Sequence, residues 1–262
     1  RGLMQALLLP EPVCRLLVAR GYTDVEAAKR FLRPRLEHLS APDALRDLPR
    51  AVERIADAVR AQETIFVHGD YDVDGITSAS LLLGIFTPLG ANAAAFLPHR
   101  MDEGYGLTVD ALDRCIEEHH PKLIVTVDCG TTSTAAVARA AEHGIDVIVT
   151  DHHEPGHEVA PAHAVVNPKL GDYADEKILA GVGVAFKLAH ALLKRGRDDG
   201  RSVAALDLKE HLDLVALGTV ADVVKLDPNN RRLVAQGFIG GIRALLDRRI
   251  EQVDGDFCLT GH

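Results

Sequence analysis

Short apolar runs that alternate with helical segments fill the middle of this chain and constrain its fold more than any other feature. Each run is followed by a segment with helical periodicity or by a polar loop, which predicts strands joined by helices. A strand–helix alternation of this kind is typical of an α/β fold, with a mostly parallel sheet and helices on both faces. The predicted strands cover residues 64–68, 91–97, 123–128, 146–151 and 164–167.

Helices are predicted around this sheet, and caps mark the start of two of them. Asp24 is placed to cap the segment Val25–Leu32, and Thr108 is placed to cap the helix that it opens. Residues 1–60 are predicted to form an N-terminal helical segment that packs on the core, and residues 61–262 form the main domain. The other predicted helices are 51–61, 76–86, 108–119, 133–143, 181–194, 206–221 and 230–246.

Charge and cysteine content limit the function classes. The chain has 38 acidic and 29 basic residues and a formal net charge of −9, which argues against binding of nucleic acid through overall basicity. A local groove remains compatible with this balance, because metal ions would neutralise part of an acidic cluster. The four cysteines form no CxxC pair, which indicates reduced thiols in a cytoplasmic protein. The run Leu3–Leu9 is too short to span a membrane, so we expect no membrane partner.

Clusters of carboxylates and imidazoles follow several of the predicted elements. In sheets of this kind the ligands bind beyond the carboxyl ends of the strands, so one crevice can collect these side chains. Such groups are expensive to desolvate without a partner, and divalent cations suit them. Each residue alone has an ordinary explanation as a turn former, a helix cap or a hydrogen-bonded histidine, but the set favours a metal site. The clusters are His68 with Asp72 and Asp74, then Asp128, then Asp151-His152-His153, and finally Asp222.

The ligand chemistry indicates two divalent cations. A mixed shell of carboxylate oxygen and imidazole nitrogen suits Mn²⁺ or Mg²⁺, and the sequence does not separate the two. Two ions about 3.5–4 Å apart need a bridging carboxylate, and Asp128 after the central strand is placed to supply it. Metal pairs of this type indicate a hydrolase of phosphate esters, in which the ions stabilise the attacking and leaving oxygens.

A loop after the second predicted strand carries the main candidates for substrate contact. Arg100 can clamp a phosphate with its guanidinium group, and Tyr105 can stack on a base of any sequence. The alternative is a helix-entry loop in which Arg100 pairs with Asp102 or Glu103. The loop therefore favours a nucleic acid as substrate and leaves the structural alternative open.

Two later segments offer further candidates for substrate contact. Gly181 and Gly183 either let the backbone approach a substrate or permit close packing at a helix start, and packing is the safer interpretation. Arg231 either contacts phosphate near a helix N-terminus or is an exposed basic residue of a surface helix.

The chain resembles the DHH phosphoesterase superfamily, and within it the RecJ-type single-stranded-DNA-specific exonucleases. The superfamily is named for the triplet that stands here as Asp151-His152-His153. The resemblance covers nearly the whole chain and implies 5′→3′ hydrolysis of single-stranded DNA to 5′-mononucleotides in repair and recombination. The segments that carry it are VHGDYDVDGITS (67–78), PHRMDEGYGL (98–107), VNP (166–168), LAGVGVAFKL (179–188) and LGTVADVV (217–224), with Arg20-Gly21 and Phe31-Leu32-Arg33-Pro34 near the start.

The resemblance also implies roles for the clustered residues. His153 would face the scissile phosphate as an acid or charge stabiliser, and Asp151 would orient both histidines. Asp70 either assists in the same way or is a surface residue of its loop. The implied ligands are His68, Asp72 and Asp128 for one ion and Asp74, Asp128, His152 and Asp222 for the other.

Relatives of this type continue into a second domain (DHHA1) that closes over the active site. The chain begins with Arg1 and stops at His262 without a closing element, so we expect both ends to be cut and processive activity to be weak or absent. We expect a monomer, and the resemblance suggests a single-strand-binding protein or a helicase as partner. Two alternatives remain: an oligoribonuclease or cyclic-dinucleotide phosphodiesterase of the same superfamily, and a catalytically inactive scaffold.

Overall fold

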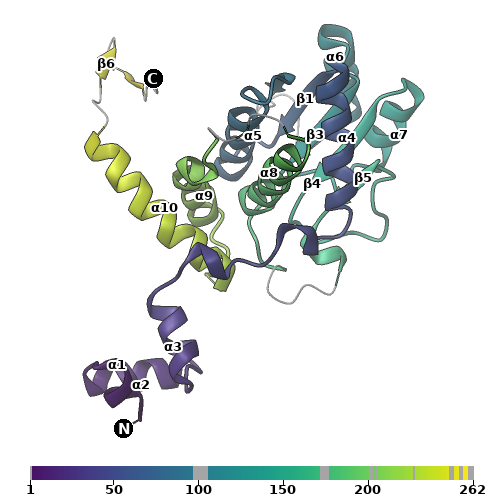
Figure 1. Ribbon diagram of the computed structural model, residues 1–262. Helices are drawn as coiled ribbons and strands as arrows, with labels where there is room; N and C mark the ends of the chain where they lie inside the picture. Colours follow the sequence, from purple (N-terminus) through teal and green to yellow (C-terminus); the bar gives the residue numbers. More distant parts are fainter. Residues whose placement is uncertain are drawn as a thin grey trace. The chain divides into compact units, whose positions relative to one another are not determined.

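Two units make up the chain, residues Arg1–Leu39 and Ser40–His262. The computed structural model in Figure 1 describes residues 2–96, 106–171, 177–200, 203, 206–226, 228–247, 251–253 and 256–258. Within these residues, no helix combines the length and the apolar character that crossing a bilayer would need.

The first unit consists of short helices around a small core of its own. Its central residues are Leu3, Cys14, Leu17 and Ala28, which are all buried. The predicted cap of the third helix is confirmed, because Oδ2 of Asp24 accepts a 2.8 Å hydrogen bond from the amide of the residue three positions on. The helices are α1 (Gly2–Leu7), α2 (Glu11–Ala19), α3 (Val25–Leu32) and the 3₁₀ helix η1 (Leu36–His38).

A five-stranded parallel sheet organises the second unit. The strands lie in the order β2-β1-β3-β4-β5, and every neighbouring pair is parallel. The predicted mostly parallel sheet is therefore confirmed. The strands are β1 (Thr64–Gly69), β2 (Asn92–Phe96), β3 (Leu123–Val127), β4 (Asp146–Thr150) and β5 (Ala164–Val166).

Helices follow most of these strands and form the outer layers. Helix α4, which falls in the segment predicted as N-terminal, belongs to the second unit and contacts α8 and β5. A short antiparallel pair, β6 (Glu251–Val253) and β7 (Asp256–Cys258), follows the last helix. The helices are α4 (Leu48–Ala61), α5 (Val73–Phe86), α6 (Val109–His119), α7 (Thr134–Glu142), α8 (Gly181–Asp198), α9 (Leu212–Ala221) and α10 (Pro228–Asp247), and the 3₁₀ helices are η2 (Pro42–Ala44), η3 (Pro168–Leu170) and η4 (Leu208–His211).

Helices cover both faces of the sheet, as Figure 1 shows. On one face, Phe66 of β1 and Val149 of β4 share a buried cluster with Leu112 of α6 and Val137 of α7. The opposite face is covered by α4, α5 and α8, which contact β5, β1 and β3 respectively. Helix α9 packs on α5 and α8, and α10 packs on α9. Strands β1, β3, β4 and β5 are buried almost completely, which explains why they are continuous apolar runs in the sequence, whereas the edge strand β2 is partly exposed.

Two helix boundaries differ from the prediction in ways that matter for the site. Helix α5 begins at Val73 rather than at residue 76, because Oδ1 of Asp72 caps it by accepting a 2.9 Å hydrogen bond from the amide of Gly75. Asp74 therefore stands in the first turn of a helix. The predicted helix 206–221 is a 3₁₀ turn followed by α9, which ends just before Asp222.

Replacement of Ile55 in α4 by alanine is expected to lower the free energy of unfolding by about 2–5 kcal/mol, because a buried side chain would leave a cavity. The matched control is Ile239→Ala in α10, where the side chain is 55% exposed. The control should change the same quantity by less than about 0.5 kcal/mol. Urea denaturation measures both variants, and equal losses would contradict the packing of α4 on the sheet.

Candidate metal centre

Carboxylates from several segments gather at one edge of the sheet. Asp70, Asp128 and Asp151 follow β1, β3 and β4 respectively, at the carboxyl ends of these parallel strands. All three are buried, with exposed fractions of 2% or less. Asp74 reaches the same place from the first turn of α5, and Asp222 reaches it from the end of α9.

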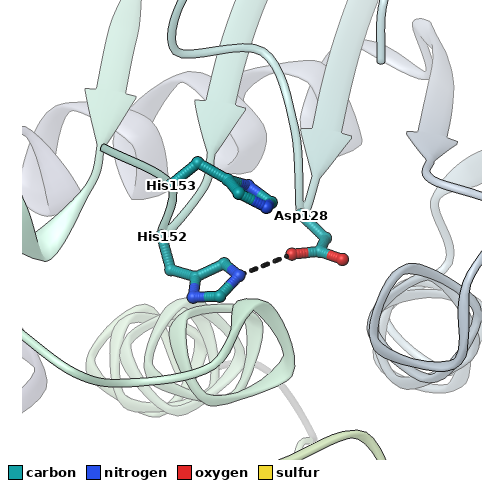
Figure 2. A group of neighbouring side chains, drawn as sticks. All are labelled: Asp128, His152 and His153. Atoms are coloured by element: carbon teal, nitrogen blue, oxygen red, sulfur yellow. Dashed lines mark ion pairs between the residues drawn. The ribbon is translucent and has the colours of Figure 1, made fainter. Parts of the chain in front are cut away.

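His152 faces three of these carboxylates. Its Nε2 atom lies 3.1 Å from Oδ1 of Asp128, 3.7 Å from Oδ2 of Asp222 and 3.9 Å from Oδ2 of Asp74. Figure 2 shows the rings of His152 and His153 beside Asp128, each extending from the end of a strand. The side chains of Asp74, Asp128, His152 and Asp222, which come from four separate segments, therefore meet in the folded chain as predicted from the sequence.

Asp128 occupies a sharp turn directly after the central strand. Its φ of 60° lies in the left-handed region, which aspartate tolerates better than most residues. The first residue of α8 approaches it closely: a Cβ atom added to Gly181 would lie 2.4 Å from Oδ1 of Asp128. Only glycine fits between the helix and this carboxylate, so the start of α8 is packed against the centre of the site.

The amino end of α8 also binds Asp74. The amide of Gly181 donates to Oδ2 at 2.6 Å, and the amide of Val182 donates to Oδ1 at 2.8 Å. These amides have no partner inside their own helix, and the positive end of the helix dipole favours a carboxylate there. On another side, a Cβ atom added to Gly218 of α9 would lie 2.9 Å from Oδ1 of Asp74. Asp74 is thus enclosed by backbone from two helices.

Asp151 holds the two histidines of its triplet. Oδ1 accepts hydrogen bonds from the amides of His152 at 2.7 Å and His153 at 3.0 Å, and it lies 2.8 Å from Nδ1 of the His153 ring. Oδ2 accepts a 2.9 Å bond from the amide of Thr131. Asp151 therefore holds the ring of His153 and the backbone of both histidines, and its implied role in orienting both side chains stays a prediction.

Asn167 extends this network and was not among the predicted site residues. Its side-chain amide donates to the carbonyl of His153 and to Oγ1 of Thr131, both at 2.9 Å. The side chain is buried, with an exposed fraction of 1%. The signal available in the sequence was an asparagine at the end of a predicted strand, where strand ends already supplied the other site residues.

The loop after β1 offers one candidate ligand beyond the implied set. Asp70, Asp72 and Asp128 form a group whose ligand atoms lie within 4.8 Å of one another. His68 is in none of the ligand groups found among the described residues, and its Nε2 atom lies 3.3 Å from the carbonyl oxygen of Gly106. Asp70, for which the sequence left two roles open, is therefore a candidate ligand, whereas the ligand role of His68 stays a prediction.

Burial sets the protonation of the cluster. Desolvation, together with the charges of Asp74 and Asp72, raises the pKa of Asp128 to about 10, and desolvation raises the pKa of Asp74 to about 6. Burial likewise lowers the pKa of His152. The hydrogen bond with Asp151 raises the pKa of His153 to about 9. A carboxyl group with a raised pKa must lose its proton before it can bind a cation. Cation binding should therefore release protons and become stronger as the pH rises.

The donor atoms fit divalent cations. Oδ1 of Asp128, Nε2 of His152 and Oδ2 of Asp222 are buried and make no hydrogen bond with the described residues. Buried polar atoms normally make hydrogen bonds, whereas these atoms only face one another as ion pairs at 3.1 and 3.7 Å, an arrangement that suits a cation bound among them. Carboxylate oxygens with one or two imidazoles are ligands that Mn²⁺ and Mg²⁺ accept. The residue groups are Asp74, His152 and Asp222; Asp128, His152 and His153; and Asp70, Asp72 and Asp128.

The candidates for substrate contact have different outcomes. Arg100 and Tyr105 lie outside the described residues. Gly181 and Gly183 are both buried, the first against Asp128 and the second against Leu179, which favours the packing interpretation. Arg231 lies in the first turn of α10 and is half-buried, and its contact with substrate stays a prediction.

Comparison with known proteins agrees with this geometry. The model of the DHH family, N-terminal domain, matches residues 64–219. The chain is 41% identical over 239 residues to the single-stranded-DNA-specific exonuclease RecJ of Bacillus subtilis (strain 168). It is 42% identical over 253 residues to the enzyme of the same name from Escherichia coli (strain K12). These alignments cover 91% of this chain but 29% and 43% of the two relatives.

Solved structures give the same result. RecJ from Thermus thermophilus in complex with Mn²⁺ is similar with a TM-score of 0.74 at 34% identity, over 90% of this chain and 32% of that chain. A structure of exonuclease RecJ bound to manganese is similar with a TM-score of 0.67 at 40% identity, over 74% of this chain and 48% of that chain. The chain therefore spans less than half the length of these relatives.

Replacement of Gly181 by alanine is expected to lower the free energy of unfolding by about 1–3 kcal/mol, because the added methyl group would overlap Asp128. Gly240→Ala in α10 is the control, since a Cβ atom there meets nothing within 4 Å. The control should raise stability by about 0.5–1 kcal/mol through helix propensity. Urea denaturation compares the two, and a tolerated Gly181→Ala would contradict the close approach of α8.

Asp128→Asn is expected to raise the melting temperature of the metal-free protein at neutral pH. The pKa of Asp128 is about 10 in the folded chain, whereas its ordinary value is 3.8. Above about pH 4 the carboxyl is therefore ionised in the unfolded chain but still protonated in the folded chain, which favours unfolding. The gain should be largest at neutral and alkaline pH and should vanish below about pH 4, where the carboxyl is protonated in both states.

Thermal unfolding in EDTA across this pH range measures the effect. Asp198→Asn is the control, because this exposed carboxylate stands at the opposite end of α8. A gain that is independent of pH, or one that the control shares, would contradict the assigned burial of Asp128.

Proposed function

We propose that this chain, which belongs to the DHH family, carries the metal-dependent catalytic site of an exonuclease that hydrolyses single-stranded DNA. The names of its relatives support this substrate and reaction. Because the chain spans less than half of their length, the activity, polarity and partners of the longer protein are all part of the proposal. We further propose a cytoplasmic monomer that releases 5′-mononucleotides in the 5′→3′ direction and acts with a single-strand-binding protein or a helicase.

One observation carries the proposal: buried ligand atoms from separate segments, which make no hydrogen bond, converge at the carboxyl edge of the sheet. Nε2 of His152 stands within 3.9 Å of carboxylate oxygens from Asp74, Asp128 and Asp222. Without a cation this arrangement places several desolvated carboxylates against one another, which is unfavourable. A pair of divalent cations removes this conflict and is the standard solution in enzymes that cleave phosphodiesters.

The two residue groups suggest how the ions are held. Asp74, His152 and Asp222 would bind one ion, with Asp128 adjacent to it. Asp70, Asp72 and Asp128 would bind the other. Because Oδ1 of Asp128 also lies 3.1 Å from Nε2 of His152 in the first group, Asp128 is the carboxylate that both ions could share. When bound, the ions supply Lewis-acid activation of water and neutralise charge on the phosphate.

The other residues of the site orient the catalytic groups and supply a proton. Asp151 fixes the ring of His153 through Nδ1. Nε2 of His153 would then contact the scissile phosphate or donate a proton to the departing oxygen. Thr131 and Asn167 hold Asp151 and the carbonyl of His153, and they act through these partners rather than on the substrate. The amino end of α8 holds Asp74 in place and favours its ionised form.

The first test is calorimetric titration of the protein with Mn²⁺. Asp128→Asn is expected to lower the affinity for Mn²⁺ by at least about tenfold, because it removes the shared ligand. Asp198→Asn should bind as the wild type does. The second test is Mn²⁺-dependent release of nucleotides from a 5′-phosphorylated single-stranded oligonucleotide, beside the matching duplex and a dinucleotide.

Preference for the single strand over both other substrates supports the proposal, even at a low rate. Equal or faster turnover of the dinucleotide would instead assign the chain to the small-substrate members of the superfamily. Absence of Mn²⁺ binding by the wild type would favour an inactive scaffold.

A further inference from the structure

The first unit carries charge of the opposite sign to the rest of the chain. Residues 1–39 contain seven Lys and Arg against four Asp and Glu, a formal charge of +3. Residues 40–262 contain 22 Lys and Arg against 34 Asp and Glu, a formal charge of −12. The second unit therefore repels a polyanion except where cations are bound, whereas the first unit attracts one.

The positive charge of the first unit is concentrated in one short stretch. Lys29, Arg30, Arg33 and Arg35 supply four basic side chains within seven consecutive residues, from the last turn of α3 to the residue before η1. Short basic stretches of this density are typical of nucleic-acid contacts. All four side chains are exposed.

These residues line a groove within the first unit, which we call the basic groove. It has a volume of 630 Å³, and its lining includes the four basic residues together with Leu8 and Leu32. Leu8 is 89% exposed and has a φ of 53°, a combination that leucine rarely adopts. The groove thus presents guanidinium groups and an apolar surface together.

Two of the guanidinium groups have no partner among the described residues. Lys29 pairs with Glu26 at 2.8 Å, and Arg35 pairs with Glu37 at 3.1 Å. Arg30 and Arg33, by contrast, make neither an ion pair nor a side-chain hydrogen bond with any residue that the structure describes. They remain available to an anionic ligand, and a guanidinium group suits the oxygen pair of a phosphate.

We propose that the basic groove is a second contact site for single-stranded DNA, separate from the metal centre. Arg30 and Arg33 contact successive phosphates, and Leu8 and Leu32 pack against sugars or bases. An acidic peptide would use the same cations, but a single strand also offers unstacked apolar faces to the leucines at the spacing of its phosphates. The proposal rests on the proposed function only for the choice of DNA as the strand.

A contact of this kind changes affinity and its dependence on salt. Each phosphate contact to a single strand contributes about −0.7 to the slope of log affinity against log salt. Loss of Arg30 and Arg33 should therefore reduce the magnitude of this slope by about 1.4 and weaken binding roughly tenfold at low salt. Because contact with both arginines needs at least two phosphates, the loss should appear with long oligonucleotides and not with a dinucleotide, which has a single bridging phosphate.

The test is fluorescence anisotropy of a labelled oligodeoxythymidylate with the whole chain in EDTA, where no cleavage occurs. The variant Arg30→Gln/Arg33→Gln is compared with Arg15→Gln/Arg20→Gln, which makes the same change of charge on exposed residues of α2 and its cap, outside the basic groove. Leu8→Ser is a second variant, and it tests the apolar side without any change of charge.

The proposal predicts weaker binding and a smaller salt slope for the first variant, weaker binding with an unchanged slope for Leu8→Ser, and wild-type behaviour for the Arg15/Arg20 variant. If both arginine double variants lost the same affinity, the effect would come from net charge rather than from the basic groove, which would overturn the proposal. Displacement of the strand by polyglutamate at matched charge concentration would assign the groove to acidic peptides and overturn it as well.

Hydrolysis distinguishes this proposal from the proposed function. Mn²⁺-dependent cleavage of a dinucleotide is expected to be unchanged by Arg30→Gln/Arg33→Gln. If the wild type binds the strand through the groove but shows no Mn²⁺-dependent hydrolysis, only the catalytic proposal fails. If hydrolysis occurs while the groove variant binds and cleaves long strands as the wild type does, only the groove proposal fails.

Discussion

The concentration of buried carboxylates at one edge of the sheet is the constraint on which the second unit depends. Asp74 and Asp128 are almost completely desolvated, and their mutual repulsion opposes ionisation. The fold offsets this cost in two ways that do not require a ligand. Two amides at the start of α8 bind Asp74, and four hydrogen bonds converge on Asp151. Asp128 has no comparable support among the described residues, which makes it the place where a cation matters most.

The parts of the fold that the sequence predicts are those governed by local rules. The strands stand where short apolar runs end in polar loops, and Asp24 and Thr108 cap the helices that follow them. Convergence of the site was also predictable, because parallel strands present their carboxyl ends at the same edge. That rule brings Asp128 and Asp151 together across 23 positions without any knowledge of their contacts.

The parts that were missed depend on approaches between distant segments. Asp70, for which the sequence left two roles open, joins a ligand group with Asp72 and Asp128 through the folded path of the chain there, and the ligand role of His68 stays a prediction. Asn167 acts on a carbonyl 14 positions away, and Gly181 bonds to Asp74 across 107 positions. Such contacts follow from the packing of whole helices, about which local propensity and spacing carry no information.

The narrow fit of α8 and α9 around the carboxylates bears on how active and silent members of such a family are told apart. A single methyl group at Gly181 or Gly218 would intrude on Asp128 or Asp74 while leaving every acidic and imidazole side chain in place. Inspection of the ligand residues alone would then still classify that chain as able to bind metal. The two glycines, which carry no chemistry of their own, belong in any diagnosis of whether a homologous centre has kept room for its cations.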